Sequence, residues 1–508
     1  GIDFVDAIND LETFGCSAGG VEICDLVAQS VARRPSPSNV TVERVQFVPY
    51  FDSECLSGEN VALVDNLIAY RKTCRHLALS CAKNFLDLKS ALPGDENLHE
   101  FEVLKRILAT AAYNDSAKNQ NVDDMKTTLA YFLQEMELCS AKNGQPVTET
   151  YAKTEKILKT DFERILRSDK MWNFCWTDLL EKPVKVLLDI VCENTAGHHL
   201  KGAFLEVEDL IAAKFLKNLH TTHPLLDGQW IMIGPDADKL EDKDAANVDA
   251  CFSYYPISSL ENSQIVNKLL EKCGNLDLVV LDRILQSKLD VVSYLRSGAA
   301  LLRDDGFMIV CETTSDFETS YILGLFYSLA QGNLSEFLSN NLNGFRKYGL
   351  FYEHEYWMSV FNKCGFQIIA HQYDKRSPYT MYLLRKLSPR DLEPAYVPID
   401  DVEKFAWVEP LQEVILQRLN DPQEKTIWIT SNTTKDNGIA GLALCLREES
   451  YKNRMRCIGD ISLSPEKRSA EELKLSLQTL NDILHKDVTM NLHRDGIWGS
   501  MRHIPLKK

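Results

Sequence analysis

Residues 203–212 decide the fold, and they read Ala203-Phe204-Leu205-Glu206-Val207-Glu208-Asp209-Leu210-Ile211-Ala212. The run begins with apolar residues typical of a buried parallel strand and then reaches an acid at Glu206. In a doubly wound α/β sheet, the cofactor binds beyond the carboxyl end of the first strand, where glycines at alternate positions let the backbone approach it closely. The three positions that would need glycine hold Glu208, Leu210 and Ala212. The sequence therefore predicts a doubly wound sheet whose cofactor loop is not competent.

A second stretch, 184–191 with Asp189, competes for the place of the first strand. In such sheets the acid that binds the ribose hydroxyls ends the second strand, roughly 20 residues after the first acid. Asp236 lies nearer to that distance from Glu206 than from Asp189. We therefore take the strand of Glu206 as the first, and we expect a helix at 183–194. Neither choice gives a competent loop, because the glycines are missing in both.

The spacing of apolar residues changes along the chain and predicts three further parts after an initial segment. Residues 1–48 contain a short strand-like run and then a proline-rich and serine-rich linker. Helical spacing at 60–182 predicts a cap of five or six helices. Strands and helices alternate at 183–386, which predicts a parallel sheet covered by helices. A shorter unit at 387–508 has the size of half a dinucleotide-binding domain.

Individual elements are predicted from apolar runs and from their flanking breakers. The predicted strands are 203–207, 230–233, 277–281, 307–312, 366–371 and 379–384 in the core, and 426–430 and 455–461 in the last unit. The predicted helices are 290–302, 441–449 and 470–485. We also expect the stretch 352–357 to open an amphipathic helix that packs Trp357 and Phe361 on the sheet.

Composition limits the possible partners of this 508-residue chain. Its formal net charge of -17 opposes binding to nucleic acid phosphates, while 45% apolar and 25% charged residues are typical of a soluble globular protein. The 14 cysteines are scattered singly, without the spacing of a zinc site, which favours reduced thiols in the cytoplasm. No apolar run reaches the ~18 residues of a membrane span. We expect no metal site, no nucleic acid and no membrane span.

The predicted fourth strand carries a motif, Asp277-Leu278-Val279-Val280-Leu281-Asp282-Arg283-Ile284-Leu285-Gln286. It resembles the motif Asp-x-Val-Val-x-x-Asn-x-Leu-His of carbon-methyltransferase domains in polyketide synthases. The resemblance implies a methyltransferase-like fold, in which the His is a catalytic base that works with a Glu ending the next strand. This chain has Gln286 at the His position and Arg283 at the Asn position, with Glu312 as a counterpart of the Glu. A neutral amide cannot accept a proton near pH 7, so the implied pair is broken.

The end of the chain carries the more specific motif, Asn491-Leu492-His493-Arg494-Asp495-Gly496-Ile497-Trp498-Gly499-Ser500-Met501-Arg502-His503. It resembles the Arg-Asp-Gly-x-Trp-Gly-x-x-Arg-His stretch of animal fatty acid synthases, of the insect type. Residues 438–449 and 454–457 resemble the same family. There these motifs belong to a truncated, structural half of a ketoreductase. Residues 18–23 are placed like the last strand of the preceding dehydratase.

The ketoreductase parts that would bind NADPH are missing from the sequence of the last unit. The stretch 431–437 is not a Thr-Gly-x-x-x-Gly-x-Gly phosphate turn, and no Tyr-x-x-x-Lys pair follows it. We expect this region to bind no cofactor, although the resemblance implies NADPH and phosphopantetheine in the parent synthase.

The resemblance implies a non-catalytic, structural region of a homodimeric cytoplasmic fatty acid synthase. It would position dehydratase, enoyl reductase and ketoreductase domains for the acyl carrier protein. Glu206, Asp236 and Glu312 are then vestiges of a working site, while Trp498 and Arg502 are candidates for an interface with a neighbouring domain or for core packing. Two alternatives stay open. One is an active or residual S-adenosylmethionine-dependent C-methyltransferase, and the other is a degenerate ligand-binding or carrier-protein docking module.

Overall fold

The computed structural model describes two α/β sheets and three short strands near the beginning of the chain. Described residues are 7–10, 15–18, 21–23, 43–55, 181–195, 199–207, 212, 215–217, 219–220, 223, 226–234, 252–256, 260, 263–285, 288, 290–314, 352–374, 379–386, 394–401, 403–419, 425–431, 438–448, 454–461 and 477–505. Two compact units are present, Gly1–Glu43 with Pro505–Lys508 and Arg44–Ile504. The predicted helical cap at 60–182 lies outside the described residues, apart from its last two.

The smaller unit contains an antiparallel sheet of three strands. They are β1 (Ala7–Asp10), β2 (Gly15–Ala18) and β3 (Val21–Ile23). The third strand lies within the strand-like run that the sequence predicts there.

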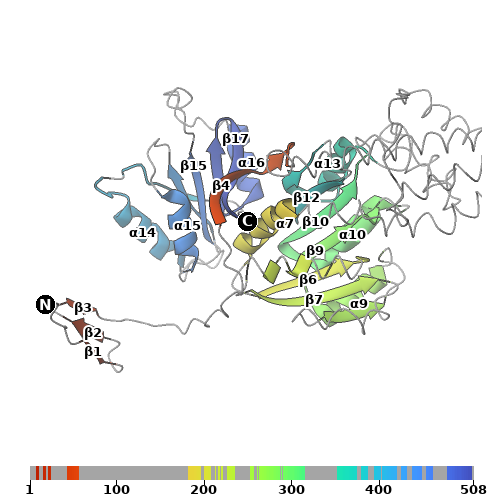
Figure 1. Ribbon diagram of the computed structural model, residues 1–508, viewed down its shortest axis with the longest axis horizontal. Helices are drawn as coiled ribbons and strands as arrows, with labels where there is room; N and C mark the ends of the chain where they lie inside the picture. Colours follow the sequence, from red (N-terminus) through yellow and green to blue (C-terminus); the bar gives the residue numbers. More distant parts are fainter. Residues whose placement is uncertain are drawn as a thin grey trace, which may run out of the picture. The chain divides into compact units, whose positions relative to one another are not determined.

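The larger unit holds an eight-stranded sheet in the order β5-β11-β12-β10-β9-β6-β7-β8 (Figure 1). Its strands are β5 (Phe51–Asp52), β6 (His199–Leu205), β7 (Asp227–Gly234), β8 (Phe252–Pro256), β9 (Leu276–Asp282), β10 (Leu302–Thr313), β11 (Phe366–Gln372) and β12 (Tyr379–Lys386). Its helices are α7 (Glu181–Asn194), α9 (Ser263–Cys273), α10 (Val291–Leu301) and α13 (His354–Lys363).

The strand order confirms the predicted doubly wound fold. From β6 the chain passes outward to β7 and β8, and it then returns to β9 on the other side of β6. The pairs β6–β7, β6–β9, β7–β8 and β9–β10 are parallel, whereas β12 runs antiparallel between β10 and β11. This is the methyltransferase-like version of the fold. The order reverses between β6 and β9, so the ligand crevice of such a sheet would lie beyond these two strand ends.

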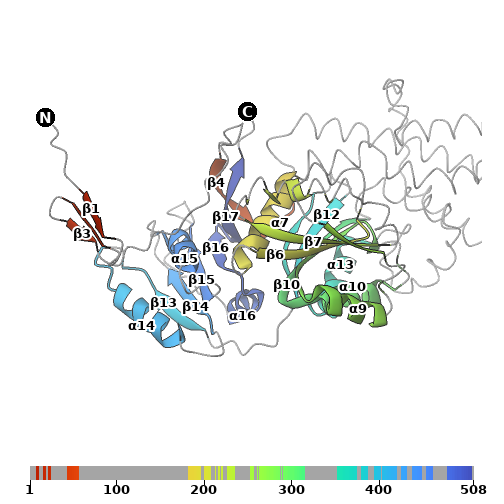
Figure 2. The same ribbon diagram turned by 90° about the horizontal axis from the view of Figure 1, so that it is seen from below.

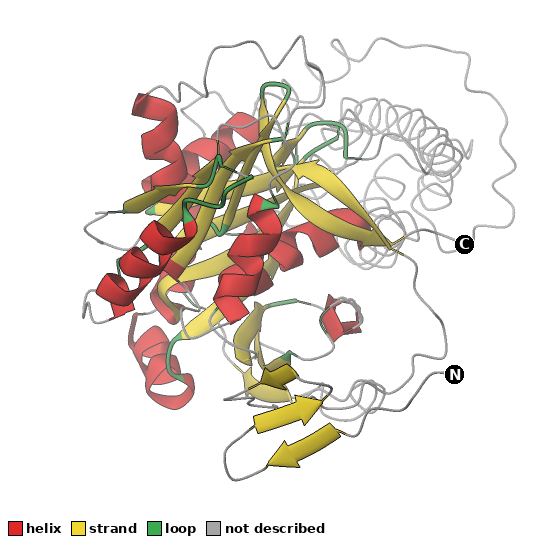
Figure 3. Ribbon diagram, turned by 90° about the vertical axis from the view of Figure 1, so that its left-hand side faces the viewer, coloured by secondary structure: helices red, strands yellow, loops and turns green. Residues whose placement is uncertain are grey.

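Apolar side chains on one sheet face form the larger core with α9, α10 and α13. Figure 3 shows the helices, in red, lying beside the strands, in yellow. Helix α10 begins where the Asp290 side chain accepts a hydrogen bond from the Ser293 amide, at 2.9 Å. Helix α13 buries Trp357 and Phe361 completely, which confirms the predicted amphipathic helix. Among the described helices, none is long and apolar enough to cross a bilayer.

A six-stranded sheet follows in the order β13-β14-β15-β16-β17-β4 (Figure 2). Its strands are β4 (Glu43–Pro49), β13 (Ala395–Pro398), β14 (Ile427–Ser431), β15 (Met455–Asp460), β16 (Met490–Arg494) and β17 (Ile497–Pro505), and its helices are α14 (Val408–Leu419), α15 (Ile439–Glu448) and α16 (Leu477–Lys486). The four strands β13 to β16 are parallel and follow chain order without reversal. Because a dinucleotide crevice forms where the order reverses, these four strands provide none.

The elements predicted for both sheets are confirmed over the described residues, with small shifts at their ends, while residues 470–476 of the helix predicted at 470–485 lie outside the described part of the chain. The helix expected at 183–194 is α7, and the strand expected at 203–207 is β6, so the choice of Glu206 over Asp189 was correct. The sequence did not predict β8, α9, β13, α14, β16 or β17 as elements. Strand β4 was also unexpected. The sequence assigned residues 1–48 to the dehydratase and a linker, but β4 pairs with β17 in the six-stranded sheet. A Cβ at Gly499 would collide with the Val48 carbonyl oxygen, so glycine permits this close strand contact.

Candidate functional site

The carboxyl end of β6 places Glu206 at the point where the strand order reverses. Its amide donates to the Ile233 carbonyl at 2.7 Å, which ties the turn to the end of β7. The residue has a positive φ of 51°, a backbone conformation that residues other than glycine rarely adopt. The chain therefore turns away directly after the strand, and the Glu206 carboxylate stays at the edge of the sheet.

Both oxygens of this carboxylate bind groups of the same chain. Lys288 Nζ lies 2.7 Å from Oε1 and 2.8 Å from Oε2, and the Tyr294 hydroxyl lies 3.0 Å from Oε1. Lys288 comes from the loop after β9, and Tyr294 from the first turn of α10. The side chains of Lys288 and Glu206 are 17% and 22% exposed, so the pair is largely removed from water. The first acid of the predicted cofactor site is thus already paired with a cation of the same chain.

The end of β9 carries a second closed ion pair. Arg283 follows the strand with a positive φ of 53°, and its Nε donates to Asp282 Oδ2 at 2.9 Å. Its guanidinium also lies 5.6 Å from the centre of the Tyr379 ring, within range of a cation–π contact. Burial alone would lower the pKa of Arg283, but Asp282 and Tyr379 raise it well above its ordinary value. Arg283 therefore stays charged, and its guanidinium is paired with the Asp282 carboxylate.

Glu312 lies near the end of β10 and is fully buried. Its Oε1 accepts a hydrogen bond from the Leu285 amide at 2.7 Å, whereas Oε2 has no hydrogen-bond partner. Burial raises the pKa of Glu312 well above its ordinary value, despite the lowering effect of the Leu285 amide. Burial therefore favours the protonated form of this side chain, which makes it a poor acceptor for a proton.

The structure brings together part of the predicted site. Glu206 follows β6 and Glu312 lies near the end of β10, and these two strands flank β9; Ala212 is buried with 1% of its surface exposed. Glu208, Leu210, Asp236 and Gln286 lie outside the described residues, so their part in the predicted site stays a prediction. Lys288 and Tyr294 were missed, because only the adjacency of β6 and β9 brings them to Glu206. Among the described residues, no group of three or more His, Cys, Asp or Glu side chains could hold a metal ion.

A second concentration of buried polar groups lies where the eight-stranded and six-stranded sheets meet. We call it the joint. It comprises Glu193, Asn194, Arg385, Arg456, Asp487, Thr489 and Arg502.

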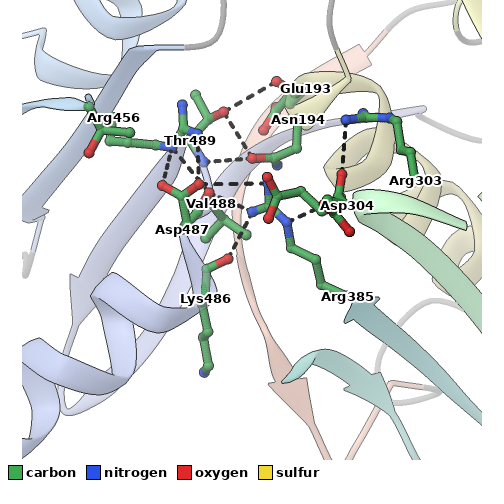
Figure 4. Close-up of polar contacts among 12 residues, drawn as sticks. Glu193, Asn194, Arg303, Asp304, Arg385, Arg456, Lys486, Asp487, Val488 and Thr489 are labelled. Atoms are coloured by element: carbon green, nitrogen blue, oxygen red, sulfur yellow. Dashed lines mark hydrogen bonds and ion pairs between the residues drawn. The ribbon is translucent and has the colours of Figure 1, made fainter. Parts of the chain in front are cut away.

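The end of α7 forms the first half of the joint. Arg502 from β17 pairs with the Glu193 carboxylate, and only 2% of the Arg502 side chain is exposed. The Arg447 guanidinium from α15 donates to the Glu193 carbonyl. The Thr489 amide donates to Asn194 Oδ1 at 2.9 Å (Figure 4). Polar groups at the end of α7 thus bond to β17, to α15 and to the residue that precedes β16, all of which belong to the six-stranded sheet and its helices.

Asp487 forms the second half of the joint, between two arginines. Arg456 from β15 donates from Nε to Oδ1 at 2.9 Å and from Nη2 to Oδ2 at 3.0 Å. Arg385 from β12 donates to the Asp487 carbonyl at 2.6 Å and to the Lys486 carbonyl at 2.9 Å (Figure 4). All three charged side chains are less than 10% exposed. Arg385 Nη2 also lies 3.7 Å from Asp487 Oδ2, so one carboxylate pairs with an arginine from each sheet.

The chain also crosses between the sheets at Tyr50. Strand β4 before it belongs to the six-stranded sheet, and β5 after it belongs to the eight-stranded sheet. The Tyr50 amide donates to the Trp498 carbonyl, and the His371 amide donates to the Tyr50 carbonyl, both at 3.0 Å. The Tyr50 hydroxyl donates to the Met490 carbonyl. One residue thus bonds to strands of both sheets.

Both candidate interface residues have partners within the chain. Arg502 pairs with Glu193 across the joint, and Trp498 packs beside a small core of Trp428, Ile458 and Ile483. Contact of either residue with a further domain stays a prediction.

The comparisons with known proteins agree with the predicted resemblance in the last unit. Residues 404–506 match the family model described as "Fatty acid synthase, pseudo-KR domain". Among solved structures, the chain is similar to the CurJ carbon methyltransferase at 13% identity and a TM-score of 0.44, covering 66% of this chain and 96% of that one. It is similar to the DszA carbon methyltransferase at 13% identity and a TM-score of 0.44, covering 68% and 99%. The CMeT domain of the citrinin polyketide synthase follows at 13% identity and 0.40, covering 64% and 94%.

The matched range begins shortly before α14 and ends just after β17. It therefore contains β14, β15, β16 and β17 of the six-stranded sheet. The C-terminal part of this chain is thus similar to the pseudo-KR domain of fatty acid synthases, which supports a fatty acid synthase region here.

Proposed function

We propose that this chain is a structural, non-catalytic region of an animal-type fatty acid synthase. In this proposal, residues 49–386 are a pseudo-methyltransferase and 387–508 a pseudo-ketoreductase, while 1–48 hold the end of the dehydratase and a linker, whose last residues form β4 and join the sheet of the pseudo-ketoreductase. The region positions the dehydratase, enoyl reductase and ketoreductase domains of a cytoplasmic homodimer for the acyl carrier protein. NADPH and phosphopantetheine act elsewhere in the parent chain.

The observation that carries the proposal is the joint. A buried ion pair adds little net stability compared with apolar residues of similar volume, but a shifted geometry would leave a buried charge without its partner. Asp487 binds Arg456 through both oxygens and also meets Arg385 from the other sheet. Such contacts tolerate little rotation between the sheets, which is the property that a spacer between catalytic domains requires.

The described residues do not fit S-adenosylmethionine, which the fold would imply, at the edge of the eight-stranded sheet. Both oxygens of Glu206 bind Lys288, and burial raises the pKa of Glu312, which disfavours the carboxylate that a catalytic base would need. No methyl-transfer step follows from this arrangement. The rival function, an active or residual C-methyltransferase, would require these groups to be free.

The test uses the complete synthase with Glu193→Met/Arg502→Met, which removes both charges of one pair and leaves no lone buried charge. We expect overall fatty acid synthesis to fall, while ketoreductase and enoyl reductase rates on free substrates stay unchanged. Asp304→Asn is the matched control, since the Asp304 side chain is 68% exposed. Unchanged overall synthesis in the double variant would contradict the proposal.

The second rival is a degenerate ligand-binding or carrier-protein docking module. A ligand that binds the folded chain raises its melting temperature by mass action. A saturable rise with one compound of a metabolite panel, or with the carrier protein, would favour this rival over a pure spacer.

A further inference from the structure

Glu206, Tyr294 and Lys288 form a constellation that the scaffold role does not require. The Lys288 ammonium contacts both oxygens of Glu206, and it also lies 4.7 Å from the centre of the Tyr294 ring. The Tyr294 hydroxyl bonds to the same carboxylate at 3.0 Å. One positive group thus meets a carboxylate and the face of an aromatic ring together.

Elements on both sides hold the carboxylate and the ring in place without help from Lys288. The Glu206 backbone is fixed by the hydrogen bond of its amide to the Ile233 carbonyl at 2.7 Å, and its carboxylate accepts a hydrogen bond from the Tyr294 hydroxyl at 3.0 Å. Tyr294 is completely buried in the first turn of α10, and its amide donates to the Asp290 carbonyl at 3.1 Å. Asp290 in turn caps the helix. The negative group and the ring are therefore preorganised, while the cation reaches them on a long, flexible side chain.

A carboxylate beside an aromatic face is a chemical arrangement that recognises ammonium groups. The carboxylate supplies charge-assisted hydrogen bonds, and the ring attracts the cation through its negative face. We infer that Glu206 and Tyr294 form a binding site for a primary ammonium group, and that Lys288 fills this site from within the chain. The ligand class of the emptied site is a small primary alkylammonium.

The inference goes beyond the scaffold role, because the site exists whether or not the region acts as a spacer. It also predicts that Lys288 competes with any external ligand that carries an ammonium group. Lys288 is present at a high effective concentration, since it is tethered only six residues beyond the end of β9 at Asp282. An external amine must displace it before it can bind Glu206.

The test empties the site in the whole 508-residue chain by Lys288→Ala and then offers propylammonium, which matches the deleted part of the side chain. We expect Lys288→Ala to melt at a lower temperature than the original chain, and millimolar propylammonium to raise that temperature in a saturable manner. Propan-1-ol and sodium chloride at the same concentrations should not raise it. The original chain should not respond to propylammonium, because its site is filled.

Two further variants separate recognition of the amine from a general effect of salt or volume. Lys288→Met has a similar length without the charge, so it occupies the space and should lose stability without any response to propylammonium. Lys288→Ala/Glu206→Gln lacks the carboxylate and should not respond either. If Lys288→Ala does not fold, propylammonium present during refolding should recover folded protein, and propan-1-ol should not.

Three results would overturn the inference. One is an equal rise with propan-1-ol or sodium chloride, and another is a response that persists in Lys288→Ala/Glu206→Gln. The third is the absence of any response in folded Lys288→Ala. None of these results would affect the scaffold proposal, which is tested by synthesis in the complete enzyme.

Discussion

The edge of the eight-stranded sheet and the joint both remove charged side chains from water, but they satisfy them differently. At the edge, Glu206 and Asp282 find their cations in the loops of the same sheet, Lys288 and Arg283. At the joint, Glu193 finds its partner Arg502 309 residues later, in the other sheet. The edge is closed within one sheet, whereas the joint is complete only when both sheets are in place.

This difference separates an abandoned site from an architectural contact. A site that is to bind a cofactor must leave polar groups free for it, but Glu206 at the edge is engaged by Lys288 and Glu312 is buried, with its pKa raised by that burial. A contact that is to fix geometry must make each side depend on the other, as Asp487 and its two arginines do. Changes at the joint should therefore cost more stability than changes at the edge.

The largest effect is expected from Asp487→Asn, which removes the carboxylate that Arg385 and Arg456 share while both arginines stay buried. Loss of one partner of a buried ion pair costs about 3–5 kcal/mol. Asparagine tolerates the positive φ of 46° at this position, so backbone strain should contribute little. Urea unfolding followed by tryptophan fluorescence measures the change. A cost below about 1 kcal/mol, the range of exposed pairs, would place the joint among surface contacts.

The next effect concerns His371 on β11, which lies beside β5 and near Lys486 of α16. Burial lowers the pKa of His371 to about 3, with further lowering by His354 and Lys486. Unfolded histidine has a pKa of about 6.5, so the unfolded state binds the extra proton between these values, and stability falls as the pH drops through this window.

Between pH 7 and pH 4 we expect the free energy of unfolding of the original chain to fall by about 2–3 kcal/mol more than that of His371→Phe, which keeps a ring beside Phe51. Unfolding by urea at a series of pH values measures it. His199→Phe is the control, since the His199 side chain is 83% exposed. Equal acid slopes for the original chain and His371→Phe would show that this histidine does not contribute.

The sequence predicted the central strands of the eight-stranded sheet and strands β14 and β15 of the six-stranded sheet from local patterns, because a buried parallel strand is a short apolar run between breakers. It also identified Glu206 as the acid of the first strand. It could not predict Lys288 as the partner, since the two residues are 82 positions apart and meet only through the adjacency of β6 and β9. A lysine shortly after the fourth strand is a signal that could have been used once the strand order was assumed.

The joint was beyond prediction for a different reason. Arg385 and Asp487 look like surface residues in a sequence, because charged residues are almost never fully buried unless they are paired. Their pairing depends on the packing of two sheets. Strand β4 was missed because it joins β17, which lies more than 400 positions later in the chain.

A smaller effect with the opposite dependence on pH is expected at the edge from Glu312→Gln. Burial raises the pKa of Glu312, so the unfolded state loses its proton at lower pH than the folded state does. The stability of the original chain should therefore fall, relative to the variant, as the pH rises above about 4.3, by at most about 1.4 kcal/mol per pH unit. Unfolding at pH 5 to 8 checks this, with the exposed Glu355→Gln as control. If the free energy of unfolding changed equally with pH in the original chain and in Glu312→Gln, the raised pKa of Glu312 would be contradicted.

The smallest effect is expected from Asp304→Asn, which removes the pair with Lys386 at 3.6 Å. Exposed pairs of this kind contribute about 0–1 kcal/mol, and the contribution decreases with salt. Urea unfolding at low and high salt measures it. A cost as large as that of Asp487→Asn would remove the distinction between the joint and the surface.

The most direct test of the account is titration calorimetry of the 508-residue chain with S-adenosylmethionine, beside an active carbon methyltransferase domain as the positive control. The account predicts no saturable heat from this chain, because Lys288 holds Glu206 and the predicted loop carries Glu208 and Leu210 in place of glycines. Saturable binding of one cofactor per chain, lost in Glu206→Gln, would contradict it.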